Sequence, residues 1–234
     1  MTLAKSTNSL IPPLENGDRL TRGEFERRYH TMSDVKKAEL IEGMVYMASP
    51  VRARKHGKPH AMVMTWLGNY WQVTPGIELL DNPTVRLDAD NEPQPDACLR
   101  MEEIVGGRSR ITEDDYIEFA PELIVEIAAS TASYDLHDKK QVYRRNQVQE
   151  YVVWRVIDSA VDWFSLQEGL YVNLPVDADG IIRSRVFPGL WLAVADLLAG
   201  NLPQLIAGLN QGLASSEYQD FRQSLGAKIT GDRS

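Results

Sequence analysis

The sequence predicts an α/β fold in which a central mixed β-sheet is flanked by helices. Short apolar runs, typical of buried strands, alternate with segments whose apolar residues recur at helical spacing. One such run, residues 122–128, is followed by a helical segment and then by a second strand at 150–157, the pattern of a parallel strand–helix–strand unit. The composition, 43% hydrophobic and 25% charged, is that of a globular protein with one sizeable core.

The N-terminal part of the chain predicts an arm, a short helix and a hairpin. Residues 1–18 are rich in Ser, Asn and Pro and are expected to form a loose arm. Thr21 stands three residues before Glu24, the spacing of a capping box, which predicts the start of a helix. In AELIEGMVYMASP, Glu42 and Gly43 separate two short apolar runs, so we expect two strands joined by a tight turn.

The middle of the chain predicts one long helix and the first strands of the sheet. We expect a helix over about residues 53–73, because Met62, Trp66 and Tyr70 recur at helical spacing. Two strand-like segments, GIELLDNPTVRLD and DACLRM, are separated by the turn-rich ADNEPQP. The next residues, 102–120, are acidic and predict irregular structure.

Five segments are expected to share one mixed sheet, on which a helix over residues 135–147 packs. These segments are residues 39–48, 84–88, 96–100, 122–128 and 150–157. A further strand pair in AVDWFSLQEGLYVNL is expected to continue the sheet.

The chain is expected to divide into a core domain and two appendages. Residues 19–200 predict the core domain, and residues 201–234 a C-terminal helical extension that is polar and frayed from about residue 215. The leucines near this end are expected to pack in the core or in a dimer interface, which makes a homodimer a candidate assembly. They are Leu197, Leu198, Leu202, Leu205, Leu209 and Leu213.

Composition argues against a membrane or secreted protein. No run of 18 or more apolar residues is present, so we expect no transmembrane helix and no membrane partner. The N-terminus lacks the continuous apolar core of a signal peptide. Cys98 is the single cysteine, so no intrachain disulfide can form, which fits a cytoplasmic location.

The charge distribution bears on nucleic-acid binding. A formal net charge of −8 argues against a protein that coats nucleic acid non-specifically, but not against an enzyme with basic residues on one face. The sequence has two basic clusters. The first comprises Arg19, Arg22, Arg27 and Arg28, and we expect it to be a solvated surface. The second comprises Arg52, Arg54, Lys55 and Lys58; it follows MASP near a helix start and is a candidate lining of a groove mouth.

A glutamate inside an apolar strand is the first indication of a functional site. Glu126 stands within LIVEIA with no cation beside it in the sequence, and burial of an unpaired carboxylate costs several kcal/mol. Asp96 begins a second apolar strand. Asp135, Lys139 and Tyr143 are spaced at i, i+4 and i+8, one face of the helix that follows the Glu126 strand. Lys139 can therefore reach the sheet edge that carries both carboxylates.

Two carboxylates and a lysine suit metal-dependent phosphodiester hydrolysis. Asp96 and Glu126 supply hard oxygen ligands for Mg²⁺, with Mn²⁺ as a possible substitute, and the backbone carbonyl of Ile127 can add a third. Such a metal polarises the phosphoryl group and activates a bound water. Lys139 can orient that water or offset developing negative charge. We expect Asp96, Glu126 and Lys139 to converge on one solvent-accessible cleft.

The chain resembles the Uma-type family of predicted restriction endonucleases in the PD-(D/E)XK nuclease superfamily. The resemblance runs from about Thr21 to Leu198 and is carried by ELIEG, ASP, QPDACL, APELIVEIAAST, YDLHDKKQVYRRNQVQEYVVWRVID and FPGLWL. It implies a restriction-endonuclease-like core, with Asp96 and Glu126 as metal ligands and Lys139 as the active-site lysine. It also implies that Glu39 is a further acidic contributor.

The chain departs from the superfamily pattern at one position. The simplest pattern has a lysine two residues after the acidic one, and here Ala128 stands there. The resemblance implies that the lysine has moved to the next helix, as Lys139. Lys140 is the adjacent alternative but points about 100° away on a helix. The family's SPST is AAST here, which should affect the strand exit and not the chemistry.

Each candidate residue of the site also has a structural interpretation. Glu126 could form a purely structural pair with Lys139, Asp96 could be a turn residue, and Glu39 could be solvated. Asp135 is expected to be the N-cap of its helix, and Tyr143 a packing residue with its hydroxyl at the rim. Cys98 is expected to be a small buried hydrophobe.

His56 and His60 offer an alternative metal site. Their i, i+4 spacing permits zinc chelation, but no third ligand follows in an HExxH arrangement. A surface or groove-lining position is therefore the expectation.

These observations predict a cytoplasmic, Mg²⁺-dependent DNA endonuclease. Asp96 and Glu126 would hold the metal and Lys139 would position the attacking water. The alternative is a catalytically silent nuclease-fold protein that binds nucleic acid or a protein partner, which the acidic net charge favours. No recognised DNA-reading module is present in the sequence.

Overall fold

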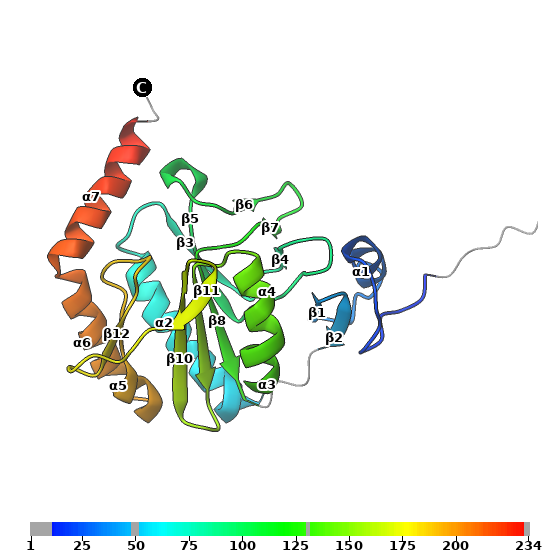
Figure 1. The fold of residues 1–234 in the computed structure, drawn as a ribbon, viewed down its shortest axis with the longest axis horizontal. Coiled ribbons are helices and arrows are strands. Elements are labelled where there is room, and N and C mark those ends of the chain that lie inside the picture. Colours follow the sequence, from blue (N-terminus) through cyan, green and yellow to red (C-terminus); the bar gives the residue numbers. More distant parts are fainter. Residues whose placement is uncertain (1–10, 48–51, 130–131, 232–234) are drawn as a thin grey trace, which may run out of the picture.

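A six-stranded mixed sheet forms the centre of the molecule, whose computed structural model describes residues 11–47, 52–129 and 132–231 (Figure 1). The strands lie in the order β11-β10-β9-β8-β5-β3. The pair β8 and β9 is parallel and the other neighbours are antiparallel, which confirms the expected α/β fold. The bounds are β3 Ile77–Asp81, β5 Ala97–Met101, β8 Leu123–Ala128, β9 Glu150–Arg155, β10 Ala160–Gln167 and β11 Leu170–Asn173.

A helical crossover joins the two parallel strands, as parallel pairing requires. It begins as α3 (Ala132–Tyr134), continues as the π-helical segment η3 (Asp135–Lys139) and ends as α4 (Lys140–Arg145). The helix expected over residues 135–147 is therefore present, but it starts three residues earlier. Buried Val142 and Tyr143 on α4 face the sheet.

The two faces of the sheet have separate cores because successive residues of a strand point to opposite sides. Ile124 of β8 belongs to the core under α4 with Tyr143, whereas Val125 belongs to the core under α2 (Lys58–Trp71) with Trp66. Figure 1 shows α4 in front of the sheet and α2 behind it. Glu126 follows Val125 and so faces the α3–α4 crossover.

Two segments expected in the central sheet lie outside it. The described part of residues 39–48 belongs to a separate hairpin of β1 (Ala38–Ile41) and β2 (Met44–Met47). Within residues 84–88, β4 (Val85–Arg86) joins a three-stranded sheet with β7 (Ile117–Glu118) and β6 (Arg110–Ile111).

The strands β1 and β4 lie outside the central sheet because both edges of β5 are already paired, with β8 and with β3. The strand β3 pairs along the full length of β5, so no edge remains there for β1 or β4. The segment after β3 contains Pro83, Pro93 and Pro95, which lack the N–H that a continuous ladder needs. Residues 102–120 are irregular as expected, apart from β6, β7 and a 3₁₀ turn, η2 (Glu103–Val105).

The N-terminal helix and hairpin form as predicted. Thr21 caps α1 (Arg22–Tyr29), its Oγ1 accepting the Glu24 N–H at 3.4 Å. Glu42 and Gly43 have φ of 53° and 70°, as the tight turn between β1 and β2 requires.

The described part of the N-terminal arm, residues 11–18, is held to this hairpin. Leu14 is 3% exposed and lies in a small core with Phe25 and Leu40. The Gly17 N–H donates to the carbonyl of Val45 at 2.8 Å. The expectation of a loose arm is therefore wrong for these residues, because one apolar side chain and backbone pairing fix them; residues 1–10 lie outside the described part.

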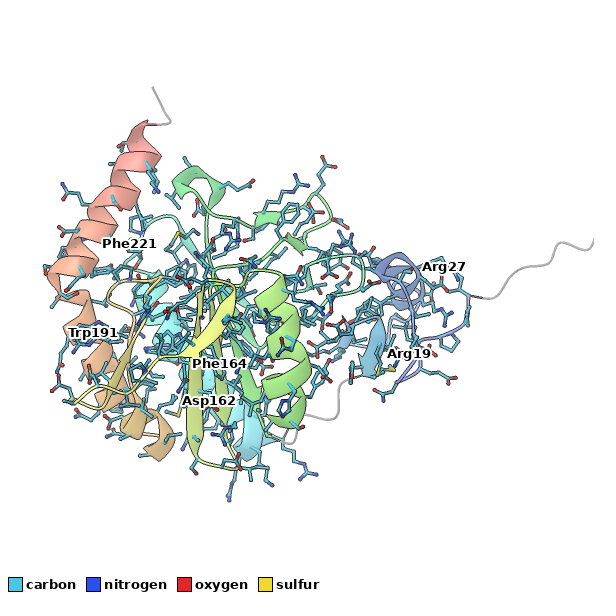
Figure 2. The ribbon with its side chains drawn as sticks, viewed as in Figure 1. Arg19, Arg27, Asp162, Phe164, Trp191 and Phe221 are labelled. Atoms are coloured by element: carbon cyan, nitrogen blue, oxygen red, sulfur yellow. The ribbon has the colours of Figure 1, made fainter. Side chains whose placement is uncertain are left out.

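The C-terminal helices cover the α2 side of the sheet. They are α5 (Val194–Ala199), α6 (Leu202–Leu213) and α7 (Ser216–Gly231), and α6 packs on the hairpin of β12 (Ile181–Arg183) and β13 (Trp191–Ala193). Figure 2 shows Trp191 and Phe221 on this side, far from Arg19 and Arg27 at the N-terminal end. Leu205 and Leu209 are fully buried, so these two leucines are core residues. None of the described helices has the length and apolar character needed to cross a bilayer.

The expectation of a frayed C-terminus is wrong for residues 216–231. Within polar α7, Tyr218 and Leu225 stand seven residues apart on one face and are both buried. The Tyr218 hydroxyl donates to the Val73 carbonyl at 2.8 Å, and Lys228 Nζ donates to the Val105 carbonyl at 2.7 Å. Two anchors and two polar contacts are enough to dock a helix whose mean composition is polar.

Candidate active site

Asp96 and Glu126 lie on neighbouring strands, next to the point where β5 and β8 separate. The paired register ends at Ala97 opposite Val125, so Asp96 and Glu126 are the next residues along each strand. Beyond this point the Asp96 side chain replaces the missing backbone partner, because its Oδ2 accepts the Ile127 N–H at 2.7 Å. In an extended strand the N–H and C=O of one residue point to the same edge, so the Ile127 carbonyl faces this edge as well.

Lys139 reaches Glu126 from the crossover helix. Its Nζ lies 2.9 Å from Glu126 Oε1 and 2.8 Å from Glu39 Oε1, with Asp135 Oδ1 at 3.9 Å. Lys140, the adjacent alternative, points elsewhere and lies over the ring of Phe164 at 3.5 Å. Lys139 ends the π-helical segment η3, and single π-helical turns inside α-helices are often found at functional sites.

Glu39 joins this group from the hairpin outside the sheet. Its Oε1 accepts the Gln94 N–H at 2.7 Å in addition to its contact with Lys139. It is 8% exposed, so it is not a solvated strand residue. The structure therefore brings Asp96, Glu126, Lys139 and Glu39 together.

Tyr143 and Asp135 differ from their expected places. The Tyr143 hydroxyl donates to Glu126 Oε1 at 2.9 Å and is buried, not at the rim, because Tyr143 lies one turn after Lys139 on the sheet-facing side. Asp135 is not the N-cap, since the helix starts at Ala132; it is 3% exposed and faces Lys139.

The electrostatics of the group reflect an excess of acids around one lysine. Burial raises the pKa of Glu126 to about 8; Lys139 opposes this shift, and the nearby carboxylates of Asp96, Asp135 and Glu39 add to it. Burial lowers the pKa of Lys139, but the surrounding carboxylates outweigh burial and hold that pKa well above its usual range. At neutral pH Lys139 is therefore charged, and Glu126 retains a proton because burial outweighs the opposing effect of this ammonium.

Asp96 has partners of its own that the sequence did not indicate. Its Oδ1 lies 3.2 Å from His56 Nε2 and 3.5 Å from Lys37 Nζ. Burial alone raises the pKa of Asp96, but the His56 hydrogen bond, the Lys37 charge and the Ile127 N–H together lower it to about 2. Asp96 is thus ionised.

The two histidines do not face one common metal position. His60 Nε2 contacts Asp81 Oδ1 at 3.0 Å and the Asp96 carbonyl at 3.1 Å, whereas His56 contacts the Asp96 carboxylate. The basic cluster around His56 was the sequence pattern that indicated a groove mouth at this place. No sequence pattern indicated that Lys37, just before β1, would reach Asp96.

The expected solvent-accessible cleft is not present at the carboxylates. Asp96 is 4% exposed, and Glu126 and Lys139 are each 3% exposed. The crossover helix packs directly over Glu126 and covers it. A cavity of about 160 Å³ lies nearby at the carboxyl end of β8, but none of the four predicted site residues lines it. Its lining residues are Ala128, Ala129, Ala132, Ser133, Arg155, Ile157 and Asp158.

The donor set fits a hard divalent cation. The carboxylates of Asp96 and Glu126 and the carbonyl of Ile127 are all oxygen donors, the type that Mg²⁺ prefers, and Mg²⁺ usually keeps several waters. A cation would also replace the proton that Glu126 retains. Among the described residues no three His, Cys, Asp or Glu side chains are grouped as a ready metal site, so two carboxylates, a carbonyl and water are the fitting set.

Comparison with solved structures shows the same fold elsewhere. A crystal structure of a "putative nuclease belonging to DUF820" from Anabaena variabilis has a TM-score of 0.55 with this chain at 14% sequence identity. The similarity covers 74% of this chain and 97% of that one. A comparison with curated proteins finds no match.

The sequence also matches a protein family over most of its length. The Uma2 family, described as "Putative restriction endonuclease", matches residues 23–195. That range contains the hairpin, the central sheet and every residue of the site described above. The chain therefore belongs to the Uma2 family.

Proposed function

We propose that this protein is a metal-dependent DNA endonuclease that hydrolyses phosphodiester bonds. The observation that carries the proposal is the contact of Lys139 with Glu126 while Asp96 stands beside Glu126 on the neighbouring strand. Membership of the Uma2 family and the fold shared with the Anabaena protein support it. A purely structural ion pair would not need a second and a third carboxylate at the same place.

The residues have distinct roles in this proposal. Asp96, Glu126 and the Ile127 carbonyl would hold Mg²⁺, or Mn²⁺ in its place. When bound, the cation would polarise the phosphoryl group and lower the pKa of a bound water. Lys139 would supply the positive charge that offsets the negative charge developing on the phosphoryl oxygens.

The remaining contacts hold these groups in place. The Tyr143 hydroxyl and Lys139 bind the same oxygen of Glu126, Oε1, and no described residue donates to Oε2. Glu39, anchored by the Gln94 N–H, fixes Lys139 from the other side. The lysine and the carboxylate are therefore oriented before any ligand arrives, which is how a site limits reorganisation during reaction.

A cleavage assay combined with metal titration tests the proposal. Mg²⁺ and Mn²⁺ binding would be measured by calorimetry, and cleavage on plasmid and branched DNA. Asp96→Asn and Glu126→Gln should lose metal binding and cleavage together, because each removes ligand charge. Lys139→Ala should still bind metal but cleave roughly 10²–10³-fold more slowly.

Lys140→Ala is the matched control, because the neighbouring lysine lies on Phe164 and not on Glu126. It should cleave as the unmodified protein does, and circular dichroism should show that all variants fold. The alternative, a catalytically silent nuclease-fold protein, predicts a different result. No DNA form should then be cleaved with Mg²⁺ or Mn²⁺, and Glu126→Gln should still bind the same partner as the unmodified protein.

A further inference from the structure

We propose that Lys37 and His56 form a phosphate-binding subsite at the solvent side of Asp96, which holds a backbone phosphate of the DNA. This inference rests on the proposed function, because it names the part of the substrate that contacts the site. It assigns a phosphate-binding role to Lys37, which the sequence did not single out, and to His56, for which the sequence suggested only a zinc ligand or a groove-lining position.

The two side chains come from separate parts of the chain and meet at one oxygen. Lys37 directly precedes β1, and His56 lies in the π-helical segment η1 (Ala53–Gly57) at the start of α2. Both nitrogens contact Asp96 Oδ1, at 3.5 Å and 3.2 Å, while Asp96 Oδ2 is taken by the Ile127 N–H. Any ligand that approaches Oδ1 therefore meets both nitrogen donors.

Exposure shows from which side a ligand reaches Asp96. The side chains of Lys37 and His56 are 25% and 24% exposed, whereas that of Asp96 is 5% exposed. Glu126 and Lys139 are covered by the crossover helix. Among the polar side chains around Asp96, Lys37 and His56 are thus the ones that solvent, or a substrate in its place, contacts directly.

The surface next to this subsite carries cations without acidic partners. Arg54 and Lys55 are exposed on η1 beside His56, and neither forms an ion pair with a described residue. The first basic cluster differs, since Arg27 pairs with Glu24 and Arg28 with both Glu24 and Asp18. Figure 2 shows Arg27 on the outer side of the N-terminal helix.

The unpaired cations indicate an anionic ligand. In a chain of net charge −8, the basic residues around His56 are the local exception. Phosphate accepts hydrogen bonds from ammonium and imidazole N–H groups, and a polyanionic backbone gains from several cations along one edge. A duplex lying over η1 would bring one phosphate to Lys37 and His56 and its neighbours to Arg54 and Lys55.

A structural role for Lys37 and His56 is the competing explanation, and a double-mutant comparison separates the two. If Lys37 only neutralises Asp96, then Lys37→Ala should have no effect on DNA binding once Asp96→Asn has removed that charge. If Lys37 contacts phosphate, Lys37→Ala should weaken binding in both backgrounds.

The measurement is fluorescence anisotropy of a short labelled DNA duplex in EDTA, at several salt concentrations. We expect Lys37→Ala to weaken binding roughly threefold to tenfold at low salt and to reduce the slope of log K against log salt by about 1. His56→Ala should weaken binding with a smaller change of slope. Lys37→Arg should retain the charge and most of the binding.

Arg27→Ala is the matched control, because Arg27 is exposed but already paired with Glu24. It should change neither the affinity nor the slope. Unchanged binding and slope in Lys37→Ala and His56→Ala, or an effect of Lys37→Ala that disappears in the Asp96→Asn background, would overturn the subsite.

The same experiments distinguish this inference from the proposed function. A protein that never cleaves DNA but binds it through Lys37 and His56 would refute the nuclease and keep the subsite. If the unmodified protein cleaves DNA and the Lys37→Ala and His56→Ala variants bind DNA normally, the nuclease is supported and the phosphate-binding subsite is refuted. A folding defect in Lys37→Ala is avoided by Lys37→Gln, which keeps the length and polarity of the side chain and should show the same loss.

Discussion

The ammonium of Lys139 lies 2.9 Å from Oε1 of Glu126, and each of the two residues is 3% exposed. This contact answers how an apolar strand tolerates a carboxyl group. The site combines a buried ammonium, a tyrosine hydroxyl and a retained proton on Glu126, as its raised pKa of about 8 indicates. Burial of such a group is costly, so its partners should be visible in the stability of the protein.

Removal of the ammonium should destabilise the fold. Lys139→Met keeps an unbranched apolar chain but leaves the carboxylate of Glu39, whose Oε1 lies 2.8 Å from the Lys139 Nζ, buried without its cation. Since loss of one partner of a buried pair strands the other charge, we expect the free energy of unfolding to fall by roughly 3–5 kcal/mol at neutral pH. Denaturant unfolding of the metal-free protein measures this loss.

Lys140→Met provides the comparison on the same helix. Its pKa is lowered by partial burial, but it lies over an aromatic ring and has no buried carboxylate as a partner. We expect a change within about 1 kcal/mol for this cation–π contact. Equal losses for Lys139→Met and Lys140→Met would show that the buried ion pair does not stabilise the protein.

The core of the site was predictable from local patterns. The parity of β8 places Glu126 on the same face as Ile124, and helical spacing places Lys139 and Tyr143 one turn apart. These relations depend only on strand and helix periodicity. The contact of Lys139 with Glu126 then follows once the crossover packs on the sheet.

The rest of the site depends on contacts between distant segments. Lys37 and His56 meet at Asp96 because the β1 hairpin and the start of α2 pack there, which no local pattern encodes. Strand pairing is likewise non-local: β3 pairs with β5, whereas β1 and β4, which were expected in the same sheet, pair elsewhere. The depth of burial at Glu126 depended on how closely the crossover covers the strand, which spacing alone does not define.

A second buried acid should make stability depend on pH. Burial, with the carboxylate of Glu26 beside it, raises the pKa of Glu92 to about 9 from 4.5. Glu92 is 2% exposed and its Oε2 has no hydrogen-bond partner among the described residues. Between these two pKa values the folded state holds a proton that the unfolded state has lost. The free energy of unfolding should therefore fall as pH rises from about 4.5 to 9, by at most about 1.4 kcal/mol per pH unit from this group.

Glu92→Gln removes this titration. Denaturant unfolding at about pH 5.5 and 8.5 should show a smaller loss of stability in Glu92→Gln than in the unmodified protein. Glu24→Gln is the control, because the hydrogen bonds from Arg27 and Arg28 lower the pKa of Glu24 to about 2. Its contribution is complete above pH 4.5, so the Glu24→Gln curve should run parallel to that of the unmodified protein. A parallel curve for Glu92→Gln as well would contradict the raised pKa.

Two glycines in the C-terminal helices should respond to alanine in opposite directions. A Cβ on Gly212 of α6 would overlap the carbonyl oxygen of Gly189 and lie 2.7 Å from Cγ of Trp191. The helix and the β13 segment must then move apart, at a cost of roughly 1–3 kcal/mol. A Cβ on Gly226 of α7 meets no atom within 4 Å, so Gly226→Ala gains helix propensity of about 0.5–1 kcal/mol.

Thermal unfolding measures both changes, since each kcal/mol shifts Tm by about 2–4 °C in a protein of this size. We expect Gly212→Ala to lower Tm and Gly226→Ala to raise it. The rise would require α7 to be helical and docked through Tyr218 and Leu225, because better helix propensity in a frayed tail does not stabilise the fold. An unchanged Tm for Gly226→Ala would therefore indicate that α7 is frayed, as its polar sequence predicts. An unchanged Tm for Gly212→Ala would contradict the close packing of α6 on Gly189.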